Sequence, residues 1–563
     1  MKNCKRIFSF LLIFYSLNLF SQKTADVFPL QDVKEGAVAK GFTVIKGEDI
    51  FEFEAEIIGV QKIGSSDTDY IICKLKGKPF EDCGVVAAMS GSPLFLGGKF
   101  LGAIAIGWFF AKEPLCAATP AEKMVELYDK SSSGNIALSP KKPATFENFL
   151  SKINCSEENP KSFLAPLEEQ NITLSQGEGQ TFLKEAEISP GGMIGVQLIS
   201  GDLNLTAYGT VSSTKGNKFL AFGHPFLGLG EVDFPVVKAK VSTIMPSFAF
   251  SFKMSSSQEE IGRMILDTPY GIVCEKGVKS NTIPIEILFT NSKDEKFEKK
   301  VNIVRFPELS KMLFFLTVSQ ILDNLEENRT SSHIALESSQ FDFENGTKLE
   351  IKKQIFGGDE PSLQLSSFLS EIFELLSSNQ FEKPKIKSVK LVIHSSNGKS
   401  DGNLIQIKSL KDKVPKGDKI EIEGIFQPYQ KGFSRFSFSL PSKELPSQKI
   451  KIVVGDNISL YKRLVKSLEI VPSSFETLLS VLRKIPEGGF LYASAFTDEE
   501  SYLLGSNRIY NLPLTLKNVV PSAVNSNSKS SEKLLGELIP VMESGYFSSE
   551  LELTVEIKER EEQ

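Results

Sequence analysis

Two short segments of the chain carry the residue types that nucleophilic catalysis by serine requires. In "AMSGSP", residues 88–93, Ser90 stands next to Gly91, whose missing side chain permits unusual backbone angles and close approach. In "AFGHPF", residues 221–226, His224 lies between a glycine and a proline, directly after a strand-like segment. Serine-based acyl transfer needs a hydroxyl on a tight turn, a base within reach and backbone N–H groups that face the developing oxyanion.

These requirements give each residue an expected role. Ser90 is the expected nucleophile, because the competing Ser92 adjoins the rigid Pro93. His224 is the expected general base and then general acid. The backbone amides of Ala88 and Ser90 are the expected oxyanion hole.

The segment "VVAAMSGSPLFLGGKFLGAIA", residues 85–105, resembles the serine turn and hairpin of chymotrypsin-like proteases. More specifically, it resembles the SpoIVB-type serine peptidase family, which carries a Gly-Met-Ser-Gly-Ser-Pro motif before a turn and an apolar strand. The resemblance implies that Ser90 is the nucleophile. It also implies a substrate-binding strand edge, to which an extended peptide would add as a further strand, at Ala105, Ile106 and Gly107.

The resemblance extends to the histidine segment. The chain departs from the family's pattern once at the histidine and once at the serine turn. The family's histidine stands in a Leu-Gly-His context, which corresponds to His224, but in the family it precedes the serine instead of following it. Triad geometry does not depend on chain order, so the two halves would be exchanged in sequence. Ala88 replaces the glycine of the motif, and a positive φ at this position would strain the backbone.

The acid of the triad is the third departure. Leu75 stands where the family has its acidic residue. Asp82 is our first candidate for the missing role, and Asp69 and Asp233 are the alternatives. Each of the three also fits an ordinary turn or strand end, and an enzyme without the acid would hold its histidine less well in the required tautomer.

The composition excludes several other classes of protein. The 563 residues are 41% hydrophobic and 24% charged, and the net charge of −6 with scattered cations argues against nucleic acid as the main partner. The three histidines lie far apart, and His333 and His394 sit in alternating strand patterns typical of structural positions. Because no Cys-x-x-Cys or His-x-x-x-His pair occurs, we expect neither a metal site nor a cofactor.

The N-terminus predicts export. Residues 1–22 combine a basic start, a short apolar stretch and small or polar residues, as a secretory signal peptide does, although an uncleaved anchor is the alternative. No later stretch is long and apolar enough to span a bilayer. We therefore expect a periplasmic, cell-surface or secreted protein; the sequence does not define its oligomeric state.

The patterning predicts a mainly β protein with some helix. The expected fold is a chymotrypsin-like double β-barrel with exchanged order, then helices and a C-terminal β-sandwich-like region. The expected parts are a signal peptide (1–22), a serine-motif barrel with a short helix (23–130), a linker or arm (131–180), a histidine-motif barrel (181–305), a helical and hairpin connector (306–385) and a C-terminal domain (386–563).

The sequence thus favours an exported serine endopeptidase that cleaves a protein or peptide. The alternative is an inactive relative, a secreted binding or assembly protein that keeps the hairpin only for packing. Ala88 and the missing acid favour this alternative, whereas the intact "MSGSP" and "FGHPF" segments oppose it.

Overall fold

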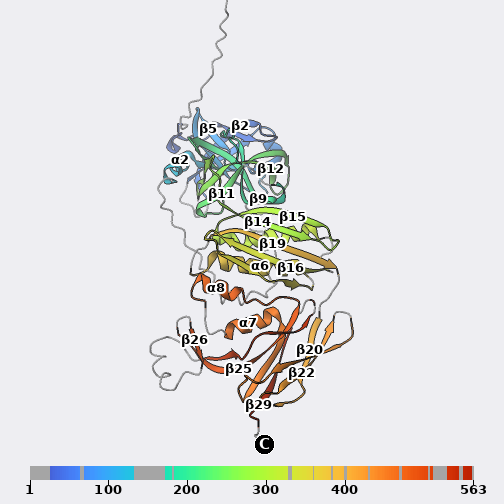
Figure 1. The fold of residues 1–563 in the computed structure, drawn as a ribbon. Coiled ribbons are helices and arrows are strands. Elements are labelled where there is room, and N and C mark those ends of the chain that lie inside the picture. The colour runs from blue at the N-terminus through green and yellow to red at the C-terminus, as the bar shows by residue number, and fades with distance from the viewer. Residues whose placement is uncertain are drawn as a thin grey trace, which may run out of the picture.

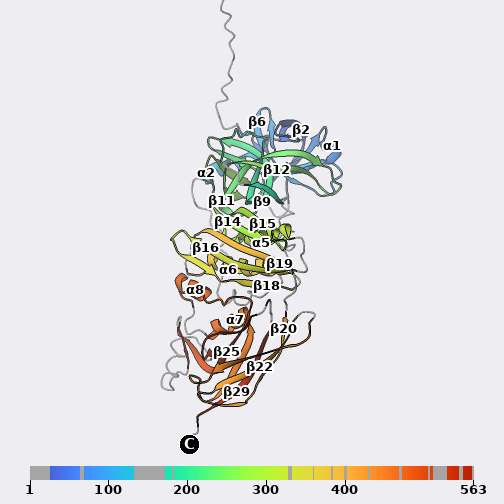
Figure 2. The same cartoon turned by 45° about the vertical axis from the view of Figure 1, so that its right-hand side comes forward.

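The computed structural model describes residues 26–63, 69–131, 172–179, 183–326, 332–358, 360–381, 385–397, 402–428, 431–467, 472–504, 507–510, 529–543, 545 and 549–560. Figures 1 and 2 show an elongated molecule, with the N-terminal strands at one end, strands and helices in the middle and the C-terminal strands at the other end. The expected signal peptide and most of the expected arm lie outside the described residues.

The serine motif belongs to a closed six-stranded barrel in the order β1-β2-β3-β7-β6-β5. Alternating apolar residues of its strands, such as Phe53, Ala55 and Ile57, point inward and form the barrel core. The strands are β1 (Val38–Val44), β2 (Ile50–Lys62), β3 (Asp69–Lys76), β5 (Pro93–Leu96), β6 (Lys99–Gly107) and β7 (Leu115–Pro120). Short helices are η1 (Leu30–Asp32), α1 (Phe80–Cys83) and α2 (Ala121–Lys130).

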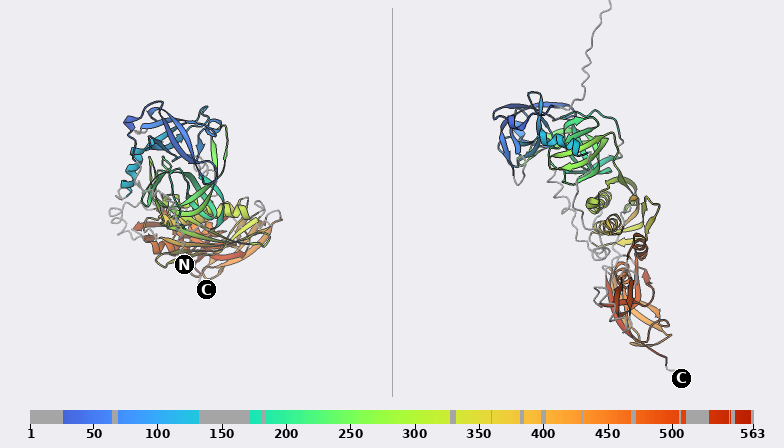
Figure 3. Two further views of the ribbon diagram at one scale, coloured as in Figure 1. Left: turned by 90° about the horizontal axis from the view of Figure 1, so that it is seen from above. Right: turned by 90° about the vertical axis from the view of Figure 1, so that its left-hand side faces the viewer.

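The histidine motif belongs to a thirteen-stranded sheet, whose main path is β10-β13-β12-β11-β9-β15-β14-β19-β16-β17. Its strands are β4 (Val86–Ala87), β8 (Ile172–Gly179), β9 (Met193–Lys215), β10 (Lys218–Ala221), β11 (Gly230–Met245), β12 (Ser251–Thr268), β13 (Gly271–Lys276), β14 (Thr282–Thr290), β15 (Lys296–Val304), β16 (Ser332–Phe343), β17 (Lys348–Ile351), β18 (Gln354–Phe356) and β19 (Ile386–Asn397). Because β10 pairs with both β9 and β13, strands β9 to β13 form a ring. Figure 3 shows the blue barrel and these green strands side by side.

The expected mainly β fold is confirmed, but the double barrel is not. The long strand β9 contributes to the ring and also pairs with β15, so the sheet continues beyond the ring. The double-barrel arrangement stays a prediction. Two expected helices, α5 (Pro307–Leu325) and α6 (Pro361–Ser378), pack against each other in this middle layer. Their rings stack at Phe314 and Phe373, with a centroid separation of 4.3 Å.

The C-terminal strands form two sheets around one apolar core. A three-stranded sheet contains β20 (Gly402–Ser409), β22 (Lys419–Pro428) and β23 (Ser434–Pro441). A seven-stranded sheet contains β21 (Lys413–Pro415), β24 (Lys449–Asp456), β25 (Phe490–Leu504), β26 (Asn507–Tyr510), β27 (Lys529–Leu534), β28 (Ile539–Glu543) and β29 (Glu550–Lys558). Side chains of both sheets, including Ile422 and Ile452, meet in the shared core. The sandwich-like packing of this region stays a prediction.

The boundary expected at residue 386 does not coincide with a break in the structure. Strand β19 pairs in parallel with β14 and antiparallel with β16, so it is part of the middle sheet. Helices α7 (Asn457–Ser467) and α8 (Phe475–Leu482) also pack on the core of that layer, where Phe475 meets Phe343 edge to face. The middle and C-terminal layers therefore share apolar contacts.

Candidate active site

The serine segment makes two consecutive tight turns. Met89 N–H donates to the carbonyl of Val86 at 3.0 Å, and Ser92 N–H donates to the carbonyl of Met89 at 2.9 Å. Ala88 has φ of +68° and Gly91 has φ of +91°. The alanine that replaces the family's glycine therefore does occupy the strained left-handed region, which L-residues other than glycine rarely adopt.

Gly91 packs by its backbone directly against the histidine segment and β9. A Cβ atom at this position would lie 2.0 Å from the carbonyl oxygen of Thr210 and 2.5 Å from the nitrogen of Phe222. Thr210 N–H also donates to the carbonyl of Ser90 at 2.8 Å. Only glycine permits this approach, so the serine turn and the histidine segment are in backbone contact.

The histidine segment is itself tightly bent. Gly223 N–H donates to the carbonyl of Ala221 at 2.9 Å, which closes a γ-turn around Phe222, whose φ is +69°. A γ-turn with positive φ is rare and strained. The hydroxyl of Thr119, at the end of barrel strand β7, donates to the carbonyl of Gly223 at 2.6 Å. The barrel thus holds the turn that presents His224.

His224 is half-buried and ready to act as a neutral base. Its Nδ1 lies 2.7 Å from the carbonyl oxygen of Pro225, which can only accept, so Nδ1 carries the proton in the bonded tautomer. Nε2 then keeps its lone pair. Burial lowers the pKa of His224, so the neutral imidazole dominates at pH 7.

Asp267 is a carboxylate whose charge acts on the pKa of His224, and the sequence did not indicate it. Asp267 is buried, and its oxygens accept the backbone N–H groups of Phe226, Leu227 and Leu229 at 2.8, 2.8 and 3.0 Å. Its charge raises the pKa of His224 against the larger effect of burial. Asp267 therefore fixes the loop after the histidine. Asp267 reaches this loop only because β12 pairs with its neighbouring strands, so no local sequence pattern indicated its role.

Asp82, the first candidate for the triad acid, lies elsewhere. It is an exposed residue of α1 and forms an ion pair with Lys78 at 3.1 Å. It lines a cavity of about 170 Å³ together with Trp108 and Phe248. The structure therefore does not bring Asp82 to His224, because the short helix turns this carboxylate toward solvent.

The alternative acids do not reach the imidazole either. Asp233 pairs with Arg263 at 3.6 Å and accepts the N–H of Asn281 at 3.0 Å. Asp69 is the exposed first residue of β3. Neither contributes to the pKa shift of His224.

Ser90 and His224 lie on adjoining turns, but no hydrogen bond joins their side chains in the described part of the chain. Ser90 is half-buried, and neither its hydroxyl nor its N–H has a partner among the described residues. A free hydroxyl and a free amide are what a nucleophile and an oxyanion donor require before substrate binds. The expected hydroxyl–imidazole bond stays a prediction.

The expected substrate-binding edge lies beside the serine turn. Ser92 and Ile104 pair through the N–H of Ile104, which donates to the carbonyl of Ser92 at 3.0 Å. Pairing with β5 stops at Ala103, whereas pairing with β7 continues to Gly107. Among the described strands, none covers residues 105–107 on the β5 side. Gly107 packs closely against Phe250 and Val85, and the substrate-binding role of Ala105, Ile106 and Gly107 stays a prediction.

Two further observations concern the described residues only. They contain no group of three or more His, Cys, Asp or Glu side chains arranged to hold a metal ion. None of their helices has both the length and the apolar character that crossing a membrane demands.

Comparison with known proteins finds that the N-terminal part of the chain is similar to a peptidase family. Residues 11–119 match the family model described as SpoIVB peptidase S55, which confirms the resemblance of the serine segment to this family. The match includes Ser90 and ends before His224. No curated protein and no solved structure matches the chain.

Proposed function

We propose that this protein is an exported serine endopeptidase that cleaves a protein or peptide with Ser90 and His224. The observation that carries the proposal is the backbone contact between the serine turn and the histidine turn at Gly91 and Phe222. The two functional residues are 134 positions apart (224 − 90), and two unrelated turns would have no reason to meet. The family match of the serine segment supports the same function.

In the proposed reaction, the Ser90 oxygen attacks the scissile carbonyl carbon while Nε2 of His224 takes the hydroxyl proton. The resulting oxyanion faces the N–H groups of Ser90 and Ala88. When the tetrahedral intermediate collapses, the C–N bond breaks and Nε2 gives its proton to the leaving amine. Water then attacks the carbonyl carbon of the acyl-enzyme while Nε2 takes a proton from the water. When this second tetrahedral intermediate collapses, the bond to the Ser90 oxygen breaks and Nε2 gives its proton to that oxygen.

The carbonyl of Pro225 takes over the orienting role that a triad carboxylate has in other serine peptidases. It holds Nδ1–H and therefore selects the tautomer with a basic Nε2. A neutral carbonyl stabilises the imidazolium less than a carboxylate does, so we expect a slow enzyme. The substrate would lie extended along residues 105–107. Export rests on the signal-peptide pattern of residues 1–22.

The direct test is labelling with a serine-reactive fluorophosphonate. We expect the wild-type protein to form one covalent adduct, and Ser90→Ala to form none. Ser92 is fully buried behind the turn and is therefore out of reach of the probe. Ser92→Ala should accordingly still label to completion, although at a lower rate. An adduct that survives in Ser90→Ala would contradict the assignment of the nucleophile.

The alternative function, an inactive secreted binding or assembly protein, rests on two observations. Ala88 sits in a strained conformation, and no carboxylate contacts the imidazole in the described part of the chain. A wild-type protein that remains unlabelled by the probe would favour this alternative.

A further inference from the structure

A lysine is buried beneath the serine turn, and no counter-ion contacts it in the part of the chain that the structure describes. Lys253 of β12 is 5% exposed, and its Nζ donates to Thr43 Oγ1 at 2.8 Å and lies 3.3 Å from Met193 Sδ. Its neighbours Phe252 and Met254 are exposed, so the strand directs its cation inward and its apolar side chains outward. An unpaired buried ammonium costs stability, which makes a purely structural role a poor explanation.

A chain of buried hydroxyls connects this lysine to the serine turn. Thr43 Oγ1 lies 3.0 Å from Ser92 Oγ, and Ser92 Oγ lies 3.5 Å from Thr210 Oγ1. Thr210 Oγ1 lies 3.2 Å from the carbonyl oxygen of Ala88. The chain therefore runs from Lys253 on β12, through both halves of the site, to the strained residue of the turn.

The hydrogen-bond directions tie Lys253 to Ser92 through Thr43. An ammonium can only donate, so Thr43 Oγ1 accepts from Lys253, and it also accepts from the hydroxyl of Ser92 at 3.0 Å. Ser92 has one hydrogen, and Thr43 is a nearer acceptor for it than Thr210 at 3.5 Å. Thr210 donates its own hydrogen to the carbonyl of Ala88.

We propose that Lys253 is a positioning residue of the site: its ammonium holds Thr43, Thr43 accepts the hydroxyl of Ser92, and the serine turn is thereby kept open for the oxyanion. This inference rests on the proposed peptidase function. Lys253 does not touch the substrate. It acts by holding Ser92 and with it the turn that carries Ala88 and Ser90, whose amides are the proposed oxyanion donors.

The surroundings make the lysine responsive near neutral pH. Burial lowers the pKa of Lys253 to about 7, and burial is the only cause of the shift. Among the described residues, Nζ has polar contacts with Thr43 of β1 and Met193 of β9, and neither titrates. Two charged side chains of the packed strands are paired elsewhere: Lys40 of β1 with Glu52 of β2, and Lys238 of β11 with Glu48.

The test compares fluorophosphonate labelling rates of wild type, Lys253→Met and Thr43→Val between about pH 5.5 and pH 9. We expect the wild-type rate to rise as His224 loses its proton and to fall as Lys253 loses its proton near pH 7. Lys253→Met should label at least about tenfold more slowly at the wild-type optimum, since a misplaced oxyanion hole slows acyl transfer. Its falling limb above pH 7 should be absent.

The melting temperature is a second readout, and we expect Lys253→Met to change it in the opposite direction to the labelling rate. Lys253→Met should raise the melting temperature while it slows labelling, because the unpaired buried charge is gone. Thr43→Val should slow labelling without this rise. Lys240→Met, an exposed position on β11, is the matched control and should leave both the rate and its pH profile unchanged.

Three results would overturn the inference. A labelled Lys253→Met with the wild-type rate and pH profile refutes the positioning role and leaves the peptidase function standing. A Lys253→Met that unfolds, together with a Thr43→Val of normal rate, shows a structural role instead. A wild-type protein that does not label removes both the proposed function and this inference.

Discussion

At the residue scale, the two turns of the site contain strained backbone conformations that hydrogen bonds from neighbouring residues maintain. Ala88 and Phe222 both have positive φ, at +68° and +69°, on the two turns that meet. Such strain persists only where the surrounding structure fixes it, and it clusters at functional sites. Here the fixing contacts are the hydrogen bonds of Thr210 to Ala88 and of Thr119 to Gly223.

Replacing Ala88 by glycine tests this strain. Ala88→Gly should stabilise the protein by about 1 kcal/mol, because relief of the left-handed strain exceeds the entropy that glycine adds to the unfolded chain. The labelling rate should be kept or increased. Urea unfolding monitored by fluorescence measures the first effect, and a loss of stability would show that Ala88 is not strained.

Lys253 predicts a pH dependence of stability. Its pKa is about 7 in the folded protein and 10.5 ordinarily, so between these values the unfolded chain binds one more proton. Stability therefore rises with pH in this window. Relative to Lys253→Met, the wild type should gain about 2 kcal/mol of unfolding free energy from pH 7 to pH 9. Parallel pH curves for the two proteins in urea unfolding would contradict the shift.

The sequence could single out Ser90 and His224 as candidates because their neighbours are unusual: a glycine that allows a tight turn, and a proline after a histidine. Asp267 and Lys253 could not be singled out in this way. Asp267 reaches the histidine loop only through the pairing of β12, 43 positions further along the chain (267 − 224). Lys253 lies where alternation would direct a lysine outward, and packing overrides that pattern.

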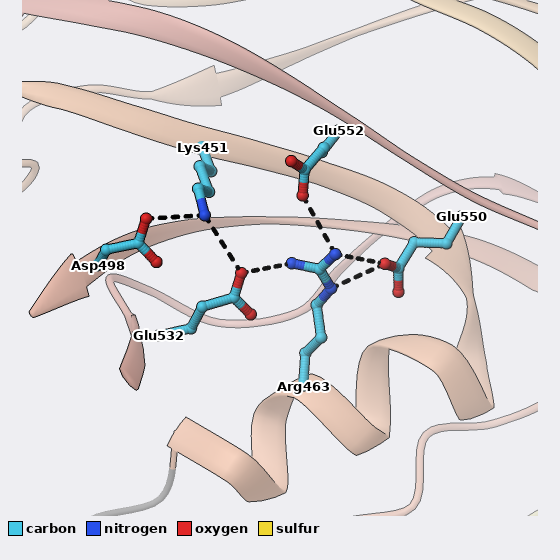
Figure 4. Close-up of polar contacts among 6 residues, drawn as sticks. All are labelled: Lys451, Arg463, Asp498, Glu532, Glu550 and Glu552. Carbon is cyan, nitrogen blue, oxygen red and sulfur yellow. Dashed lines mark hydrogen bonds and ion pairs between the residues drawn. The ribbon is translucent and has the colours of Figure 1, made fainter. Parts of the chain in front are cut away.

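At the element scale, a cluster of ions fastens α7 to the C-terminal sheet (Figure 4). Arg463 of α7 bonds Glu550 through Nε at 2.8 Å and also contacts Glu532 and Glu552 at 2.6 and 3.2 Å. Lys451 of β24 joins the same group through Glu532. Several carboxylates therefore depend on one guanidinium, whose side chain is 21% exposed.

Removing that guanidinium should loosen the helix. Arg463→Ala should cost about 2 kcal/mol, because it leaves partly buried carboxylates facing one another. Arg560→Ala is the matched control: its pair with Asp418 is exposed, so its cost should stay below about 0.5 kcal/mol. Thermal unfolding compares the two variants, and equal small effects would show that the cluster contributes little.

Most individual strands and helices followed from their patterns. The alternation in β2 and the proline-led helices α5 and α6 were visible in the sequence. What periodicity does not encode is which strands pair. Strand β19 has the same alternation as its C-terminal neighbours, but its partners are β14 and β16. For the same reason the pairing of β9 with β15, which extends the sheet beyond the ring, could not be read from the sequence.

At the scale of the whole molecule, side-chain and backbone contacts join the C-terminal part to the middle part in Figure 1. Asn457 donates to the side chain of Gln354 at 2.6 Å, and Gly488 N–H donates to the carbonyl of Lys353 at 2.7 Å. Together with Phe475 on Phe343, these contacts tie the C-terminal layer to the middle sheet.

This coupling predicts the outcome of limited proteolysis. A cut between β19 and β20 should leave two pieces that still migrate together on native gel filtration, because α7 and α8 share the core of the middle layer. The pieces should separate only in denaturant. A C-terminal fragment that leaves freely and remains folded would show that the shared core is not needed.

The central claim is that the serine turn and the histidine turn form one catalytic site. The most direct measurement is a crystal structure of the protein treated with a fluorophosphonate. We predict phosphorus bonded to Ser90, Nε2 of His224 within about 2.6–3.2 Å of a phosphonate or serine oxygen, and the amides of Ala88 and Ser90 on the phosphoryl oxygen. Side chains of Ser90 and His224 more than about 10 Å apart would contradict the claim, since proton transfer needs hydrogen-bond reach.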